Sequence, residues 1–166
     1  MSPIRLWRIS IWLHGRGLKA PALWVKKLNS VLYHNSLAPA ARVSPDLRFG
    51  HHGFGTMIHS NVEIGRRVFI WHHVTIAVRS LSEWNEPHAV VIEDGVSIGA
   101  KAMIIGPDKG SLRIGRGARI GAGAIVTKDV PAGATVVSVP PRVILREEAA
   151  AEGGAARIES GADALS

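Results

Sequence analysis

Histidine is the residue type in this chain whose number and spacing best suit chemistry. Eight histidines occur in 166 residues, and five of them crowd one stretch: His51, His52, His59, His72 and His73. A neutral imidazole titrates at about pH 6.5, so it can take a proton from a hydroxyl at physiological pH, and it is also a common metal ligand. The chain has no cysteine, which excludes disulfides, thiolate metal sites and a thiol nucleophile. The histidines therefore indicate proton transfer or metal binding.

The scaffold that must position these histidines is predicted by aliphatic residues that recur in steps of six. The repeated positions are Ile58, Ile64, Ile70 and Ile76, then Ile92, Ile98 and Ile104, then Ile114, Ile120 and Val126. A period of six fits neither an α-helix nor a long simple strand, but it does fit a short strand and a turn, repeated. The pattern predicts a parallel β-helix, in which three hexapeptides make a triangular coil and stacked coils share one core. Glycine often follows the aliphatic residue directly and is expected to permit the tight corner.

Exceptions to the repeat are where a site is expected. Counting back six residues from Ile58 places His52 in the inward aliphatic position, where an imidazole needs a partner or an opening. A purely structural histidine in an imperfect first coil is the alternative. Two insertions also break the phase, one between Ile76 and Ile92 and one after Ile104. Insertions leave a solenoid as loops, and loops on a rigid scaffold commonly build sites.

Composition predicts the remaining organisation. Residues 1–35 are expected to form an amphipathic helical segment, residues 36–145 the β-helix, and residues 146–166 a disordered tail without period. The formal charge is +7, and no Asp or Glu precedes Asp46. No nucleic-acid-binding module accompanies this charge, so no nucleic acid partner is expected. The helical segment is expected to cap the β-helix or join a subunit contact, or alternatively to touch a membrane as a peripheral surface helix, with no transmembrane span or secretory signal.

Three segments of the chain resemble the hexapeptide-repeat acyltransferases, specifically the serine acetyltransferase branch and its short polysaccharide-cluster relatives. They are HHGFGTMIHSNVEIGRRVFIWHHVTI, VIEDGVSIGAKAMIIG and IGRGARIGAGAIVTKDVPAGATVVSVPPRVI. The resemblance implies a left-handed parallel β-helix, a homotrimer, and transfer of an acetyl group from acetyl-CoA to a hydroxyl. His52 is then the catalytic base of a direct transfer, which suits a chain that lacks cysteine and a G-x-S-x-G motif.

The resemblance also assigns binding residues and no metal. We expect acceptor contacts from His51, His72 and His88. The resemblance implies acetyl-CoA contacts from Gly99, Ala100, Gly121, Ala122, Thr127, Lys128 and Arg142. Small residues would admit the pantetheine arm, and the two cations would face its phosphates. Corner geometry alone is the alternative explanation for the glycines.

Several departures from the serine acetyltransferase pattern bear on the acceptor. His51 stands where the family has an aspartate, and Pro87 and His88 stand where it has an Arg-His pair. No acid occurs near residues 36 and 37, where the family places the carboxylate partner of its base, and Asp46 is the nearest substitute. We therefore expect an O-acetyltransferase that acts on a sugar or glycan precursor in polysaccharide biosynthesis, in the cytoplasm or at the inner membrane surface.

Three alternatives remain open. The first alternative is a serine O-acetyltransferase of cysteine biosynthesis. The second is a non-catalytic β-helix scaffold, which is open because the carboxylate partner of the base is missing. The third alternative is a zinc site of the gamma-class carbonic anhydrase type, whose β-helices bind zinc between subunits through three histidines. His52, His72 or His73, and His88 are the candidates for that role.

Overall fold

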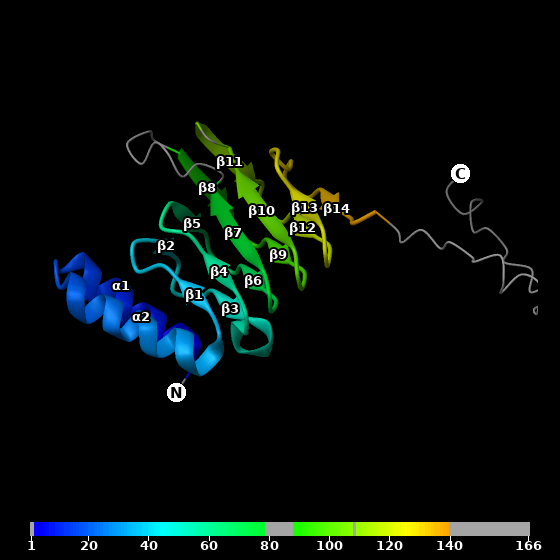
Figure 1. Ribbon diagram of the computed structural model, residues 1–166. Helices are drawn as coiled ribbons and strands as arrows, with labels where there is room; N and C mark the ends of the chain where they lie inside the picture. Colours follow the sequence, from blue (N-terminus) through cyan, green and yellow to red (C-terminus); the bar gives the residue numbers. More distant parts are fainter. Residues whose placement is uncertain (1, 79–87, 108, 140–166) are drawn as a thin grey trace, which may run out of the picture.

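Three parallel sheets wrap around one axis and form a β-helix (Figure 1). The computed structural model describes residues 2–78, 88–107 and 109–139. The strand order is β1-β4-β7-β10-β13 in the first sheet, β2-β5-β8-β11 in the second and β3-β6-β9-β12-β14 in the third. Each coil therefore contributes one strand to each sheet in turn, and the prediction of a parallel β-helix is confirmed.

The elements follow one another in a regular order along the chain. They are α1 (Pro3–Gly15), α2 (Lys19–Tyr33), β1 (Ser36–Leu37), β2 (Arg42–Val43), β3 (Arg48–Phe49), η1 (Gly50–Gly53), β4 (Met57–Ile58), β5 (Val62–Ile64), β6 (Phe69–Ile70), β7 (Thr75–Val78), β8 (His88–Ile92), β9 (Ser97–Ile98), β10 (Met103–Gly106), β11 (Gly110–Ile114), β12 (Arg119–Ile120), β13 (Ile125–Val126) and β14 (Thr135–Val136). Most strands have only two residues, so each depends on the coils above and below it for its hydrogen bonds.

The aliphatic residues of the repeat lie in register on the inside of the three sheets. In the first sheet Ile58 pairs with Ile76 and Ile76 with Ile104, and the other two sheets repeat this alignment. These side chains are buried, as are the smaller residues four positions later, such as Val62 and Ala102. Each buried isoleucine contributes about 1.5–3 kcal/mol relative to an exposed one, so the narrow core is stable without many aromatic residues.

The first coil departs from the predicted phase. Phe49 pairs with Ile70, so the inward position expected for His52 belongs to Phe49. Nine residues, rather than six, separate Phe49 from Ile58. The additional residues form the turn η1, on which His52 is exposed. The prediction that His52 occupies the core position is therefore wrong, because counting by six from Ile58 misses an insertion this short.

The glycines after the aliphatic residues permit close approach between coils. At Gly99 a Cβ would lie 2.5 Å from the backbone nitrogen of Ala122 in the next coil. Gly99 itself has no positive φ, and the left-handed residue of its corner is Lys101, with φ of 60°. A glycine is needed here for a different reason from the corner conformation expected from the sequence: stacked backbones about 4.8 Å apart leave no room for a side chain.

The predicted N-terminal helical segment is confirmed as a hairpin of α1 and α2 that covers one end of the β-helix (Figure 1). Trp7 is buried in this contact, where its indole N–H donates to the carbonyl of Ala38 at 2.8 Å and its ring stacks on Phe49. Within the described ranges, no helix combines the length and the apolar character needed to cross a bilayer. The tail predicted at residues 146–166 lies outside the described residues, and the domain boundaries stay predictions.

Candidate active site

Histidines gather on the edge where the third sheet turns into the first. The corners of successive coils stack there, at residues 50–56, 71–74, 99–102 and 121–124, and we call this the histidine edge. Backbone hydrogen bonds join the corners: His73 donates to the carbonyl of Phe54 at 2.7 Å, Lys101 to that of His72 at 3.1 Å, and Gly123 to that of Ala100 at 2.9 Å. Four corners far apart in the sequence therefore form one continuous column.

The first corner of this column, at residues 50–56, contains the turn HHGFG. His51 and His52 both adopt left-handed backbone angles, with φ of 47° and 57°. Non-glycine residues rarely take this conformation, although histidine does so more often than most, and such strain concentrates at functional sites. Gly55 completes the turn at φ of 67°, and a Cβ there would lie 2.1 Å from Nδ1 of His73. The turn is thus built to hold imidazoles closely against it.

His51 and His72 are brought into contact by this turn. Their rings meet edge to face with centroids 4.9 Å apart, and His51 also lies 5.6 Å from the ring of Trp71. Burial of its imidazole lowers the pKa of His72, and the nearby His51, His73 and Lys101 lower it further. His72 Nδ1 is buried, and no group in the described part of the chain hydrogen-bonds to it. The shift favours the neutral form of His72, and its buried Nδ1 is a polar atom for which the described fold supplies no partner.

His52 points to a different neighbourhood from His51. Its ring lies 6.3 Å from that of Tyr33, and it lines a hollow of about 310 Å³ between the start of α1 and the third sheet. Arg48 and Phe69 line the same hollow. The side chain of His52 is exposed, so a substrate hydroxyl has open access to it.

Asp46 does not take the role of carboxylate partner to His52. Its carboxylate accepts a hydrogen bond from the Ser44 hydroxyl at 2.6 Å. That bond, together with a backbone N–H of Arg67, lowers the pKa of Asp46 although partial desolvation opposes the shift. Asp46 and His52 lie on opposite sides of β3, at different edges of the β-helix. The suggestion that Asp46 substitutes for the missing acid is therefore not supported by the geometry.

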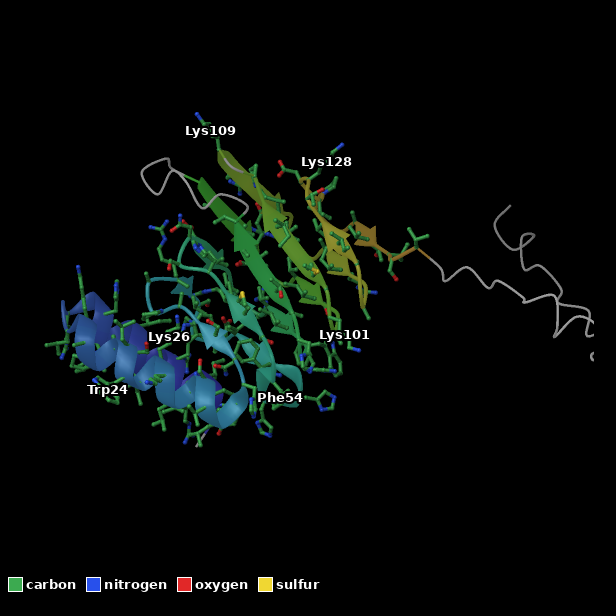
Figure 2. All side chains as sticks on the ribbon, viewed as in Figure 1. Trp24, Lys26, Phe54, Lys101, Lys109 and Lys128 are labelled. Atoms are coloured by element: carbon green, nitrogen blue, oxygen red, sulfur yellow. The ribbon has the colours of Figure 1, made fainter. Side chains whose placement is uncertain are left out.

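The predicted acetyl-CoA residues divide between two edges. Gly99, Ala100, Gly121 and Ala122 lie on the histidine edge, in the two coils that follow His72. Thr127 and Lys128 follow β13 at the opposite edge of the first sheet, and Figure 2 shows Lys128 on the side away from Phe54 and Lys101. Arg142 lies outside the described residues.

His88 is also separated from the histidine edge within one chain. Its backbone begins β8 and pairs with Gly110, at the same edge as Thr127 and Lys128. The four-residue strand β7 separates the two edges, which is roughly 13 Å at 3.3 Å per residue. Of the three predicted acceptor residues, the structure thus brings together His51 and His72 but not His88, whose side chain lies outside the described part of the chain.

The first sheet presents an apolar strip between these edges. Met57, Thr75, Met103 and Ile125 stand side by side on neighbouring strands, in register. Met57, Met103 and Ile125 are exposed. Covering this strip with a long ligand that has an apolar arm, or with another protein surface, would cost little desolvation free energy, because few polar side chains there would need new partners.

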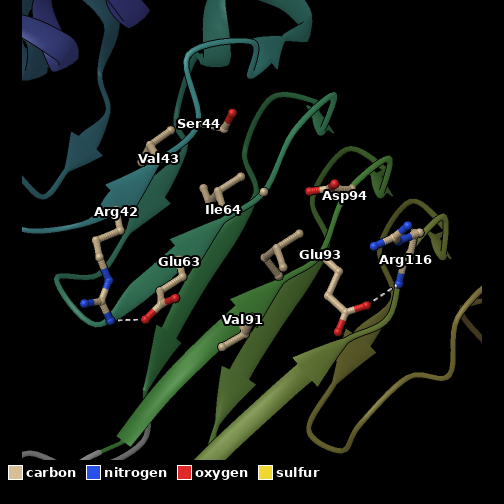
Figure 3. Close-up of a pocket in the computed structure, with 11 residues that line it drawn as sticks. Arg42, Val43, Ser44, Glu63, Ile64, Val91, Glu93, Asp94 and Arg116 are labelled. Atoms are coloured by element: carbon tan, nitrogen blue, oxygen red, sulfur yellow. Dashed lines mark hydrogen bonds and ion pairs between the residues drawn. The ribbon is translucent and has the colours of Figure 1, made fainter.

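A second hollow, of about 580 Å³, lies at the edge between the second and third sheets (Figure 3). Its charged groups already have partners: Glu63 pairs with Arg42, and Glu93 accepts from the Arg113 guanidinium and from the backbone N–H of Arg116. The hydrogen bond from Arg113 is the main reason that the pKa of Glu93 is lowered. The hollow was not predicted from the sequence, and the carboxylates of Glu63 and Glu93 in it are engaged in these contacts.

Several neighbours of the histidines were missed from the sequence. Tyr33, Trp71 and Phe54 surround the imidazoles, and Arg48 shares the hollow with His52. Trp71 follows Ile70 directly, so aligning the corners of successive repeats would have placed it on the same edge as the turn. Within the described residues, no three His, Asp or Glu side chains are placed to hold a metal ion. The zinc alternative depends on His88 and stays untested.

The chain is similar to serine acetyltransferases in sequence and in structure. No family model matches it. The serine acetyltransferase of Escherichia coli (strain K12) is 32% identical over 141 residues, which cover 85% of this chain and 49% of that protein. That of Bacillus pumilus (strain SAFR-032) is 37% identical over 109 residues, covering 65% and 46%.

Solved structures show the same relationship. The serine acetyltransferase of Neisseria gonorrhoeae in complex with serine superposes with a TM-score of 0.70 at 33% identity, covering 85% of this chain and 55% of that one. The enzyme of Brucella abortus strain S19 in complex with coenzyme A superposes with a TM-score of 0.73 at 31% identity, covering 85% and 54%. The predicted left-handed β-helix is confirmed by this likeness.

The chain spans about half the length of the relatives it matches. Within that half, the similarity covers most of the described β-helix together with its histidine turn. In sequence and fold, the chain is similar to the serine acetyltransferase branch of the hexapeptide-repeat acyltransferases over the half of those proteins that it spans.

Proposed function

We propose that this protein is an acetyl-CoA-dependent O-acetyltransferase whose chemistry takes place at the histidine edge. The observation that carries the proposal is the contact of His51 with His72, in a column of corners that continues into two corners of small residues, with the exposed His52 next to His51 in the same turn. A relative with the same fold has been solved with coenzyme A. The histidines supply a base, and the corners above them supply a surface along which a narrow thioester arm can lie.

The reaction would proceed by direct transfer. An imidazole nitrogen takes the proton of the acceptor hydroxyl while its oxygen attacks the thioester carbonyl. The tetrahedral oxyanion then collapses, the carbon–sulfur bond breaks, and the CoA thiolate leaves and is protonated by the imidazolium. Backbone N–H groups would stabilise the tetrahedral oxyanion. The chain has no cysteine to form an acyl-enzyme, which agrees with a single displacement.

Within this mechanism we assign the base role to His52 and a positioning role to His51 and His72. His52 is exposed beside an open hollow, whereas the two other imidazoles pack against each other. His52→Ala should lower kcat by about two to four orders of magnitude. His72→Ala should raise KM more than it lowers kcat. His14→Ala, on α1, is the matched control and should leave both constants unchanged. A reversed pattern, with kcat lost only in His72→Ala, would transfer the base role to His72.

L-Serine is the first candidate acceptor. The relatives named above are serine acetyltransferases, and one was solved in complex with serine. The expectation of a sugar acceptor, made from the sequence, finds no support among these relatives. We therefore rank the serine alternative above it, and with it a place in cysteine biosynthesis rather than polysaccharide biosynthesis.

A hydroxyl on a neutral molecule such as a sugar is the second candidate, for one structural reason. The described corners of the histidine edge contain no Asp or Glu that would hold the ammonium group of serine. The test is thiol release from acetyl-CoA with L-serine, compared with a panel of sugars and lipid-linked saccharides. Release with serine alone establishes the first candidate, release with a saccharide alone the second. Release with neither, from folded protein, contradicts the enzymatic proposal and favours the scaffold alternative.

A homotrimer remains our proposal for the assembly. The predicted site residues lie on two edges of the first sheet, and a neighbouring copy would bring His88, Thr127 and Lys128 towards the histidine edge. The exposed strip of Met57 and Ile125 would be covered by the same contact. Light scattering should then give about 53 kDa, three times the 17.7 kDa of the chain. A monomer mass that retains full activity would contradict a shared site.

A further inference from the structure

Helix α2 exposes its apolar side to solvent. Leu23, Trp24, Leu28, Val31 and Leu32 follow the spacing of one helix face, and each is between 48% and 71% exposed. A surface helix normally turns such a stripe towards the core and its polar residues towards water. Here the arrangement is reversed, so the stripe is a surface that the described fold does not use.

The opposite side of α2 is occupied by small and polar groups. Ala22 is buried and its carbonyl accepts a hydrogen bond from the Ser10 hydroxyl at 3.0 Å. Asn29 is buried and its amide donates to the carbonyl of Pro3, also at 3.0 Å. These bonds determine which side of α2 faces α1, because turning the helix would leave Asn29 and Ser10 without these partners. The outward direction of the apolar stripe is therefore built into the hairpin.

The charge around the stripe is of one sign. No Asp or Glu occurs before Asp46, whereas the two helices and their connection carry the basic residues Arg5, Arg8, Arg16, Lys19, Lys26 and Lys27. Arg16 lies 3.8 Å from the ring centre of the exposed Trp12, and Lys27 lies 6.0 Å from that of Trp24. Figure 2 shows Trp24 on the outer side of the helices, away from the strands. An exposed tryptophan thus lies beside a cation on each of the two helices.

The positive charge distinguishes between two possible binding partners of the apolar stripe, a second copy of the chain and an anionic surface. A second copy of α2 placed on the stripe would bring two sets of cations together without any carboxylate from either hairpin to compensate, and like charges at an interface are unfavourable. An anionic surface has the opposite sign and also accepts apolar side chains. Trp and Leu side chains enter the boundary between headgroups and acyl chains, while Lys and Arg extend to lipid phosphates.

We propose that the outward face of α2 docks on an anionic phospholipid bilayer. The helix would lie flat on the surface, with Trp24 and Leu28 at the headgroup boundary and Lys19 and Lys27 beside lipid phosphates. The bilayer is contacted and not crossed. The proposal concerns the helical hairpin and is independent of the reaction at the histidine edge, so either can fail without the other.

Vesicle flotation of the full chain tests this docking. Vesicles of phosphatidylcholine mixed with phosphatidylglycerol should carry the protein, and vesicles of phosphatidylcholine alone should bind it at least about 25-fold more weakly, the contribution expected of two or more surface cations. Lys19→Gln combined with Lys27→Gln should weaken binding to the mixed vesicles by about 25-fold. Trp24→Ser combined with Leu28→Ser should weaken it by about tenfold or more. Raising salt from about 0.1 M to about 1 M should also release the protein.

Matched controls come from the β-helix. Arg119→Gln removes an exposed cation of the third sheet, and Val139→Ser removes an exposed apolar residue beyond β14, so neither should change flotation. Brominated phosphatidylcholine in the mixed vesicles should quench tryptophan fluorescence, and Trp24→Phe should reduce that quenching while binding persists. Equal binding to both vesicle types, or binding unaffected by the Trp24 and Leu28 changes, overturns the proposal. A fall in oligomer mass on those changes, without vesicle binding by the unchanged protein, assigns the face to a second copy instead.

Discussion

Gly99→Ala tests whether the corner glycines are required by the stacking of coils. A Cβ at this position would lie 2.5 Å from the nitrogen of Ala122 and 2.8 Å from the carbonyl carbon of Gly121. Both are backbone atoms, and the N–H of Gly99 is bonded to the carbonyl of Ile120 at 2.7 Å, so no side chain can rotate away. We expect a loss of about 3 kcal/mol, the upper part of the usual cost of overpacking. For a chain of this size that is about 6–12 °C in Tm.

Gly123→Ala is the matched control, because it separates sterics from backbone conformation. Gly123 has φ of 69°, and no atom lies within 4 Å of the place that a Cβ would take, so only the left-handed conformation should cost free energy, about 1–2 kcal/mol. Thermal unfolding by circular dichroism, at one protein concentration, should rank wild type above Gly123→Ala and Gly123→Ala above Gly99→Ala. A Gly99→Ala protein that unfolds like wild type would refute the stacking argument. If Gly99→Ala kept wild-type stability but bound acetyl-CoA more weakly, the glycine would be needed for ligand binding instead.

Three further predictions concern the core, the imidazoles and the turn. Ile98→Ala should lower the free energy of unfolding in urea by about 2–5 kcal/mol, because the side chain is fully buried, whereas Val139→Ala, at a highly exposed position, should change it by less than about 0.5 kcal/mol. The lowered pKa of His72 means that the unfolded chain binds more protons below about pH 6.5, so stability should fall from about pH 7 to about pH 5, and His72→Gln should flatten that slope in urea titrations at each pH. Gly55→Ala should displace the ring of His73 and lower turnover in the thiol-release assay, and unchanged kinetics would show that the packing of this turn is not needed.

The repeat architecture could be predicted from local pattern because a β-helix repeats one short-range rule. Every inward residue from Ile58 to Val126 lies where the period of six places it, apart from the two predicted insertions. The prediction for the first coil failed because the insertion there is only three residues long. It also ends in glycines, which occur at ordinary corners as well. His52 was therefore chosen correctly as an exception to the pattern but placed wrongly in the core.

The composition of the site depended on which corners share an edge. His51 and His72 were both candidates in the sequence, yet their contact and the unpartnered nitrogen of His72 arise only when the first and second coils stack. The same stacking places His88 and Lys128 at the opposite edge of the first sheet. Counting the repeats in threes assigns each corner to an edge, but it does not show which side chains on one edge make contact.

The sequence by itself determined the solenoid, the short helical segment and the concentration of histidines, since periodicity and composition act through neighbouring residues. The tertiary structure alone decided which imidazoles meet, which glycines have no space for a side chain, and which side of α2 faces water. Those features depend on contacts between residues that are distant in the chain, such as Ser10 with Ala22 or Gly99 with Ala122. Long-range packing, and not local preference, therefore defines the surfaces at which this protein would act.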